Sequence, residues 1–190
     1  KSRNFLVPGS VAIVMTLVGT LLTSLVVARE WERGTMEAIM ATPVSAAELL
    51  AGKIVPYFLL GLTSMTLCVI IAILLFGVPF RGSLLALYAL SAAFLVPALG
   101  QGMLISAATK NQFLASQVAL MSGFLPAFLL SGFLFEISSM PTVIQWITLA
   151  VPARYLIQSL QTVFLAGDIW PMFLRDIAII LLIGAIFFLL

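Results

Sequence analysis

Charged residues are scarce in this chain. Only nine of its 190 residues are Lys or Arg and seven are Asp or Glu, which amounts to 8% of the sequence. A soluble globular domain carries about 25% charged residues. A chain that is 63% hydrophobic could not cover its apolar surface with so few charges. The composition excludes a cytosolic enzyme and a nucleic-acid-binding domain, and it indicates an integral membrane protein.

Histidine is absent, and cysteine occurs once. The lack of His removes imidazole as a metal ligand and as the usual general base. The single cysteine, Cys68, lies in an apolar run, where a lone thiol usually serves as a small hydrophobic side chain. The sequence also offers no paired carboxylates and no activated nucleophile. We therefore expect no metal site, no catalytic residue and no cofactor within this chain.

Long apolar runs dominate what is present. A membrane-spanning helix needs about 20 apolar residues, and five runs reach that length. They do not alternate between apolar and polar residues, as transmembrane strands do. We predict an all-α polytopic membrane protein with five transmembrane helices. The predicted spans cover about residues 5–28, 54–76, 84–108, 113–135 and 171–190.

Residues 29–53, here called the charged link, join the first two spans and hold seven of the sixteen charges. Gly34 suits a helix C-cap, Thr35 can cap a new short helix, and Pro43 ends that helix. The sequence SAAE at residues 45–48 matches a capping box that opens the second span. A helix of about seven residues is unstable in water, so it must lie on the membrane or dock against a partner. The plainer alternative is a solvated loop whose charges mark the interface.

Residues 136–170, here called the apolar link, join the last two spans. We predict two short helices at about residues 140–150 and 153–165, separated by Pro152. Neither is long enough to cross roughly 30 Å of hydrocarbon, so both should dip into one leaflet. We expect Arg154 to form an ion pair, with a solvated arginine as the alternative. The candidate partners are Glu136, Asp168 and Asp176.

Polar residues inside the spans are hydroxyls and two amides. Such residues usually serve helix packing, and the alternative is that they line a substrate route. The candidate route residues are Thr16, Thr20, Thr23, Thr63, Gln101 and Gln117.

Ionisable residues are missing from the middle of every predicted span. Ion-coupled transporters generally carry such residues, because the coupling ion must be bound. The chain also has no P-loop, since residues 49–54 lack its first Gly and its Ser or Thr. If the protein moves a substrate uphill, a partner must hydrolyse the nucleotide, and the charged link is where that energy would arrive.

These residues resemble a known family. The sequence AREWERGTME at residues 28–37, followed by TPVS at 42–45, Glu48 and then Gly52 and Lys53, resembles the ABC-2 type transporter permeases. A second stretch is similar to that family's external re-entrant segment before the final span. Its matching residues are Pro141, Gln145, Trp146, Pro152, Tyr155 and 165–167. The likeness covers essentially the whole chain and is greatest to bacterial multidrug-type export permeases.

The resemblance implies a domain organisation. Residues 1–190 would form an ABC-2 type transmembrane domain, a piece of a longer protein. A first span and a periplasmic domain would precede residue 1, and a short cytoplasmic tail would follow residue 190. The charged link would be the cytoplasmic coupling segment, and the apolar link a periplasmic re-entrant gate. The implied coupling residues are Glu30, Arg33, Gly34, Thr35, Glu37, Pro43, Glu48 and Lys53. The implied gate residues are Pro141, Pro152, Arg154, Tyr155 and Gly167.

The resemblance also implies a function. The chain would be the permease subunit of an ATP-driven exporter in the bacterial inner membrane. It would move an amphipathic or apolar substrate, drug-like or lipid-like, outward by alternating access. ATP and Mg would bind a separate ATP-binding-cassette subunit, and the permease would pair with a second copy or a related permease. The alternative is a non-transporting scaffold or mechanical relay driven by a partner ATPase.

Overall fold

The structure is a computed structural model that describes residues 3–190, and every regular element within that range is a helix. In chain order the elements are α1 (Arg3–Thr16), the π-helix η1 (Leu17–Leu22), α2 (Val26–Glu32), α3 (Thr35–Met40), α4 (Ala46–Leu74), α5 (Leu84–Thr109), α6 (Gln112–Ala119), the π-helix η2 (Leu120–Phe124), α7 (Leu125–Leu130), the 3-10 turn η3 (Ile137–Ser139), α8 (Thr142–Thr148), α9 (Pro152–Leu165) and α10 (Trp170–Leu189).

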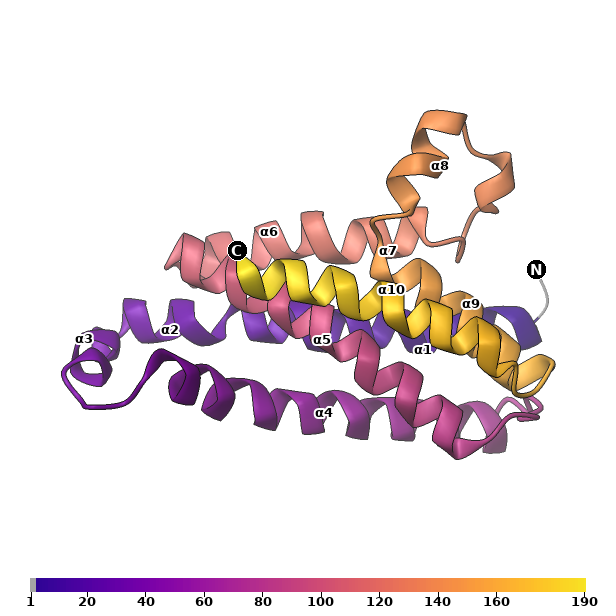
Figure 1. Ribbon diagram of the computed structural model, residues 1–190, viewed down its shortest axis with the longest axis horizontal. Coiled ribbons are helices and arrows are strands. Elements are labelled where there is room, and N and C mark those ends of the chain that lie inside the picture. Colours follow the sequence, from indigo (N-terminus) through magenta and orange to yellow (C-terminus); the bar gives the residue numbers. More distant parts are fainter. Residues whose placement is uncertain (1–2) are drawn as a thin grey trace.

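Five helical stretches are long and apolar enough to cross a membrane, and they run along the long axis of one bundle (Figure 1). They are Asn4–Glu32, Ala46–Leu74, Leu84–Thr109, Gln112–Leu130 and Trp170–Leu189. The predicted all-α polytopic fold with five spans is therefore confirmed. The first stretch joins α1, η1 and α2, and the fourth joins α6, η2 and α7.

The first span ends at Glu32, four residues beyond the prediction, and two other boundaries differ more, each for a local reason. The second helix begins at Ala46, eight residues before the predicted start, because the Ser45 capping box extends it beyond the apolar run. The fourth helix stops at Leu130 rather than near residue 135. Gly132 follows with φ +88°, a left-handed conformation that ends a helix and favours glycine.

Apart from the segment that carries α8, the connecting segments gather at the two ends of the bundle (Figure 1). The charged link and the turn between α5 and α6 lie at one end. It is here called the elbow end, because the charged link bends there between α2 and α4. The turn between α4 and α5 and the junction between α9 and α10 lie at the opposite end. Alternation of five antiparallel spans produces this arrangement, since each crossing brings the chain to the other end.

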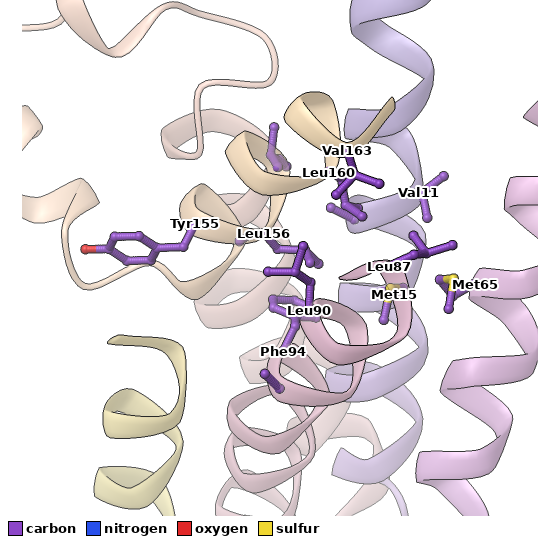
Figure 2. Packing of buried hydrophobic residues seen from close by; sticks show 14 of the residues in the cluster. Val11, Met15, Met65, Leu87, Leu90, Phe94, Tyr155, Leu156, Leu160 and Val163 are labelled. Atoms are coloured by element: carbon purple, nitrogen blue, oxygen red, sulfur yellow. The ribbon is translucent and has the colours of Figure 1, made fainter. Parts of the chain in front are cut away.

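Helix α5 forms the centre of the bundle and packs against α1, α4, α9 and α10. The main hydrophobic cluster draws Met15 from α1, Met65 from α4, Leu90 from α5 and Leu160 from α9, all fully buried (Figure 2). Most of the apolar side chains of α4 are instead exposed. Such a helix suits contact with lipid or with another membrane protein.

The two short helices predicted in the apolar link are present, and they differ in environment. Helix α8 is mostly exposed and stands at the side of the bundle (Figure 1). Helix α9 packs against α1, α5 and α10, and eight of its 14 residues are buried. Pro152 is the first residue of α9 rather than a separator, a position that proline favours. The sequence did not predict that one face of α9 belongs to the hydrophobic core.

Candidate functional site

The charged link folds as an elbow between α2 and α4. Gly34 has φ +71° and an empty space where a Cβ would lie, so its conformation rather than crowding requires glycine. It ends one helix as predicted, and α3 follows it directly. Thr35 is not the cap of α3, because Gly34 occupies that position. The Thr35 hydroxyl instead donates a hydrogen bond to the Glu30 carboxylate.

Two side-chain interactions hold the elbow to α4. The Lys53 ammonium lies 2.8 Å from a carboxylate oxygen of Glu30, and both side chains are about three-quarters buried, with 24% and 23% exposed. The predicted capping box is confirmed: the Glu48 N–H donates to the Ser45 hydroxyl at 3.2 Å, and the Ser45 N–H donates to the Glu48 carboxylate at 2.9 Å. The elbow is therefore a defined structure rather than a solvated loop.

The remaining predicted coupling residues lie on the outside of the elbow. Arg33, Glu37 and Pro43 are exposed, and Glu37 lies in the first turn of α3. No residue of α3 is buried. The structure thus separates the eight residues into an inner group that holds the elbow and an outer group that faces away from the chain.

A second set of contacts, absent from the prediction, ties the elbow to the turn between α5 and α6. One carboxylate oxygen of Glu32 accepts a hydrogen bond from the Gln112 N–H at 2.8 Å, and the other accepts from the Gln112 side chain at 2.5 Å. The Lys110 ammonium lies 4.2 Å from the centroid of the Trp31 ring, within cation–π range. About 80 residues separate the partners along the chain, and no local pattern could have paired them.

A small cavity of about 80 Å³, lined mostly by apolar side chains, lies between η1, α5, η2 and the start of α9. Thr16, Thr20 and Gln101, three of the six predicted route residues, line it. The Gln101 amide donates to the Ser122 hydroxyl at 3.3 Å across the cavity. The space can hold several waters, but it is well below the roughly 300 Å³ of a typical small-molecule site. In this conformation the bundle is closed to a drug-sized molecule.

The other three route residues lie elsewhere. Thr23 is buried, and its hydroxyl donates to the Gly19 carbonyl of its own helix. Thr63 is exposed on α4, where its hydroxyl donates to the Leu59 carbonyl at 2.8 Å. Gln117 is exposed on α6. Thr63 and Gln117 could reach a substrate only at a surface shared with another chain or with lipid.

The two π-helices face each other at the cavity. Thr20 of η1 lies against Gly123 of η2, where an added Cβ would stand 2.7 Å from the threonine methyl. Gly102 of α5 comes closer still to the end of η1, because an added Cβ would overlap the hydroxyl of Thr23, the residue that follows η1. π-Helices are rare and often occur at functional sites. Neither π-helix was predicted from the sequence.

The predicted gate residues organise the turn between α8 and α9. The Arg154 guanidinium donates to the Thr148 hydroxyl at 2.6 Å, and the Tyr155 hydroxyl donates to the Leu149 carbonyl at 2.8 Å. Pro152 begins α9 and Pro141 precedes α8. Gly167 follows the end of α9, away from that turn.

The predicted ion pair of Arg154 is wrong. Within the described part of the chain the ion pairs join Lys53 to Glu30 and Arg175 to Asp176. Asp176 is fully buried and accepts a hydrogen bond from Ser159 at 2.6 Å, while Asp168 accepts from the Ser83 N–H at 2.8 Å. Both acids are therefore held by other partners.

The chain matches known proteins along its whole length. The family described as "ABC-2 family transporter protein" matches residues 1–190. The "Probable multidrug ABC transporter permease YbhS" of Escherichia coli K12 is 51% identical over 187 residues, which cover 98% of this chain and 49% of that protein. YbhR, given the same description in that organism, is 29% identical over 88% of this chain and 48% of its own.

A third relative in Escherichia coli K12, "Inner membrane transport permease YhhJ", is 30% identical over 90% of this chain and 47% of its own length. The chain thus spans about half the length of the curated relatives it matches. No solved structure matches it. The relatives and the five apolar helices confirm the predicted multi-pass protein of the bacterial inner membrane. The chain belongs to the ABC-2 family of transporter permeases.

Proposed function

We propose that this chain is the membrane-spanning part of a permease subunit in an ATP-driven exporter. The observation that carries the proposal is the ordered elbow, which presents α3 with no buried residue. A helix of six residues is not stable alone in water. The Thr35 hydroxyl at the start of α3 donates to Glu30, which in turn pairs with Lys53 of α4. Because α3 is tied to the bundle in this way, it is suited to receive a partner on its outer face.

The partner in this proposal is an ATP-binding-cassette subunit that binds ATP and Mg and hydrolyses the nucleotide. A push on α3 reaches α4 through the Lys53–Glu30 pair and the start of α6 through the Glu32–Gln112 bonds. Helix α6 continues directly into η2, which lines the cavity. The elbow therefore connects the docking surface to the part of the bundle that must open.

Transport then requires the closed cavity to widen. Thr16, Thr20 and Gln101 are the residues that a substrate would meet there, together with apolar and aromatic side chains such as Phe94 and Phe187. This lining suits an amphipathic or apolar substrate, and YbhS is named a multidrug permease. The exposed apolar side chains of α4 offer a surface for a second copy or a related permease.

The orientation of the bundle in the membrane follows from docking of the ATPase subunit on α3. The elbow end faces the cytoplasm, where nucleotide is available, and the end with the α9–α10 junction faces the periplasm. The turn before α9 then lies in the periplasmic half, next to the cavity. It is stabilised by the hydrogen bonds of Arg154 and Tyr155 and ends at Pro152, where α9 begins.

The test is substrate-stimulated ATP hydrolysis by the full-length permease and its ATPase subunit in proteoliposomes. Glu37→Lys should reduce the stimulation at least fivefold, since Glu37 is exposed on the docking face. Arg81→Glu is the matched control, because it reverses an exposed charge in the α4–α5 turn at the opposite end. Full stimulation in Glu37→Lys, with normal assembly, would contradict the proposal.

A second function, a relay that transmits force without transport, is favoured by one observation: the cavity of about 80 Å³ admits no drug-sized molecule. ATP-dependent accumulation of a fluorescent amphipathic dye in inverted vesicles separates the two. Accumulation that is lost in a Gln101→Leu variant would support the exporter. ATP hydrolysis without accumulation of any tested dye, lipid or drug would support the relay.

A further inference from the structure

Two charges of opposite sign line one open cavity beside α9 without pairing with each other. The cavity has a volume of about 250 Å³ and lies between residues 131–138 and α9. Glu136 and Arg154 both line it, and the ion pairs of the described residues do not include them. Hydroxyls and amides from Ser131, Ser138, Gln158 and Gln161 complete its wall. A cavity with separated charges is complementary to a ligand that itself carries both signs.

A second cavity adjoins the first and is more apolar. It has a volume of about 280 Å³, shares Ile137 and Arg154 with the first, and is otherwise lined from α8 and its C-terminal end, including Trp146 and Leu149. The neighbouring face of α8 is strongly exposed: 72% of Val143, 70% of Trp146 and 53% of Ile147 is accessible. Exposed tryptophan and aliphatic side chains beside a charged group are typical of the membrane headgroup level.

Arg154 has donors left for a ligand. One of its nitrogens donates to Thr148 at 2.6 Å, while a guanidinium carries five N–H donors in a planar fork that matches phosphate oxygens. Glu136 is exposed and supplies a carboxylate for a cation. Either volume is far above the roughly 10–15 Å³ that one water needs, so a headgroup of several atoms can enter.

We propose that these paired cavities bind the headgroup of a zwitterionic phospholipid with a primary ammonium group. Its phosphate lies on Arg154, its ammonium on Glu136, and an acyl chain runs over Trp146 and Leu149. The apolar second cavity favours a membrane lipid over a free, water-soluble zwitterion, because only a lipid would use both. This site is independent of the proposed transport function, and it is tested by binding rather than by transport.

The experiment measures lipid adducts of the full-length permease by native mass spectrometry during titration in detergent. The lipids are dioleoyl-phosphatidylethanolamine, dioleoyl-phosphatidylglycerol and dioleoyl-phosphatidylcholine. Wild type should prefer phosphatidylethanolamine at least fivefold over the other two. Arg154→Gln should weaken its binding at least fivefold, since the phosphate loses its donor. Glu136→Gln should bring phosphatidylethanolamine and phosphatidylglycerol within twofold of each other, since only the ammonium contact is removed.

Arg81→Gln is the matched control, an exposed arginine outside both cavities, and it should bind as wild type does. If Arg154→Gln fails to fold, Glu136→Gln still decides, because its side chain is exposed. Equal binding of the three lipids by wild type, or an unchanged preference in Glu136→Gln, would overturn the proposal. Competition by glycerophosphoethanolamine at equal concentration would overturn the assignment to a lipid.

Discussion

The charged link and the apolar link are held in place by different forces. The charged link lies at one end of the bundle and is fixed by directional contacts, namely the Lys53–Glu30 pair and the Glu32–Gln112 hydrogen bonds, and by partial packing of Trp31 and Met36 against a small hydrophobic cluster. The apolar link sends α9 into the bundle, where it is fixed by burial against α1, α5 and α10. A segment held by a few polar contacts can be displaced by a partner at low cost, whereas a buried helix moves only with its neighbours. We therefore expect the charged link to move when a partner binds it (a lever), whereas α9 stays fixed in the bundle (an anchor).

The largest expected effect is the loss of stability when the buried packing of α9 is removed. Leu160→Ala in α9 removes a fully buried side chain and leaves a void between helices, which costs about 2–5 kcal/mol of unfolding free energy. Met40→Ala in the charged link is the control, because Met40 is 63% exposed and its loss should change stability by less than about 0.5 kcal/mol. Unfolding in detergent micelles measures both. Equal losses from the two variants would abolish the distinction between the links.

A smaller loss of stability is expected where α5 packs closely against the end of η1. Gly102→Ala places a methyl group onto the hydroxyl of Thr23, the residue that follows η1, and should cost about 1–3 kcal/mol through overpacking. Gly52→Ala is the matched control: it also lies in a helix, its added Cβ meets nothing within 4 Å, and it should stabilise by about 0.5–1 kcal/mol. The comparison is read from thermal unfolding of the two variants. A gain of stability in Gly102→Ala would show that η1 and α5 are not tightly packed.

The smallest effect on stability is expected from the polar contacts of the charged link. A double-mutant cycle with Glu30→Gln and Lys53→Met should give a coupling energy of about 0.5–1 kcal/mol, because the pair is partly exposed and such pairs contribute little. The cycle is measured by unfolding. The same variants should lower substrate-stimulated ATP hydrolysis far more than this stability change implies. Coupling above about 3 kcal/mol would mean that the elbow is as rigid as α9.

Local signals in the sequence determined the parts of the fold that a few neighbouring residues decide. The capping box at Ser45 and Glu48 and the left-handed Gly34 act within four residues, and both were predicted. The five spans were predictable because bilayer thickness sets a length that apolar runs either reach or do not. Their ends shifted where a cap or Gly132 acted beyond the apolar run.

Contacts between residues far apart in the sequence could not be predicted, because no local pattern indicates them. The Glu32–Gln112 bonds and the contact of Gly102 with Thr23 join helices that only the packed bundle brings together. Thr16, Thr20 and Gln101 were predicted as route residues from their polarity alone, and polarity equally selected the exposed Thr63 and Gln117. The burial of α9 needed knowledge of its neighbours, since its apolar face suits a membrane surface as well as a helix bundle.

The most direct test of the account is cysteine labelling of the two ends in a Cys68→Ala background. Ala38→Cys on α3 should react with an impermeant thiol reagent in inverted vesicles and be protected when the ATPase subunit is bound, because Ala38 is exposed on the elbow. Met140→Cys, before α8, should react only in intact spheroplasts. Labelling of Ala38→Cys in spheroplasts, or reactivity indifferent to the ATPase subunit, would contradict the claim that the charged link is the lever through which the permease is driven.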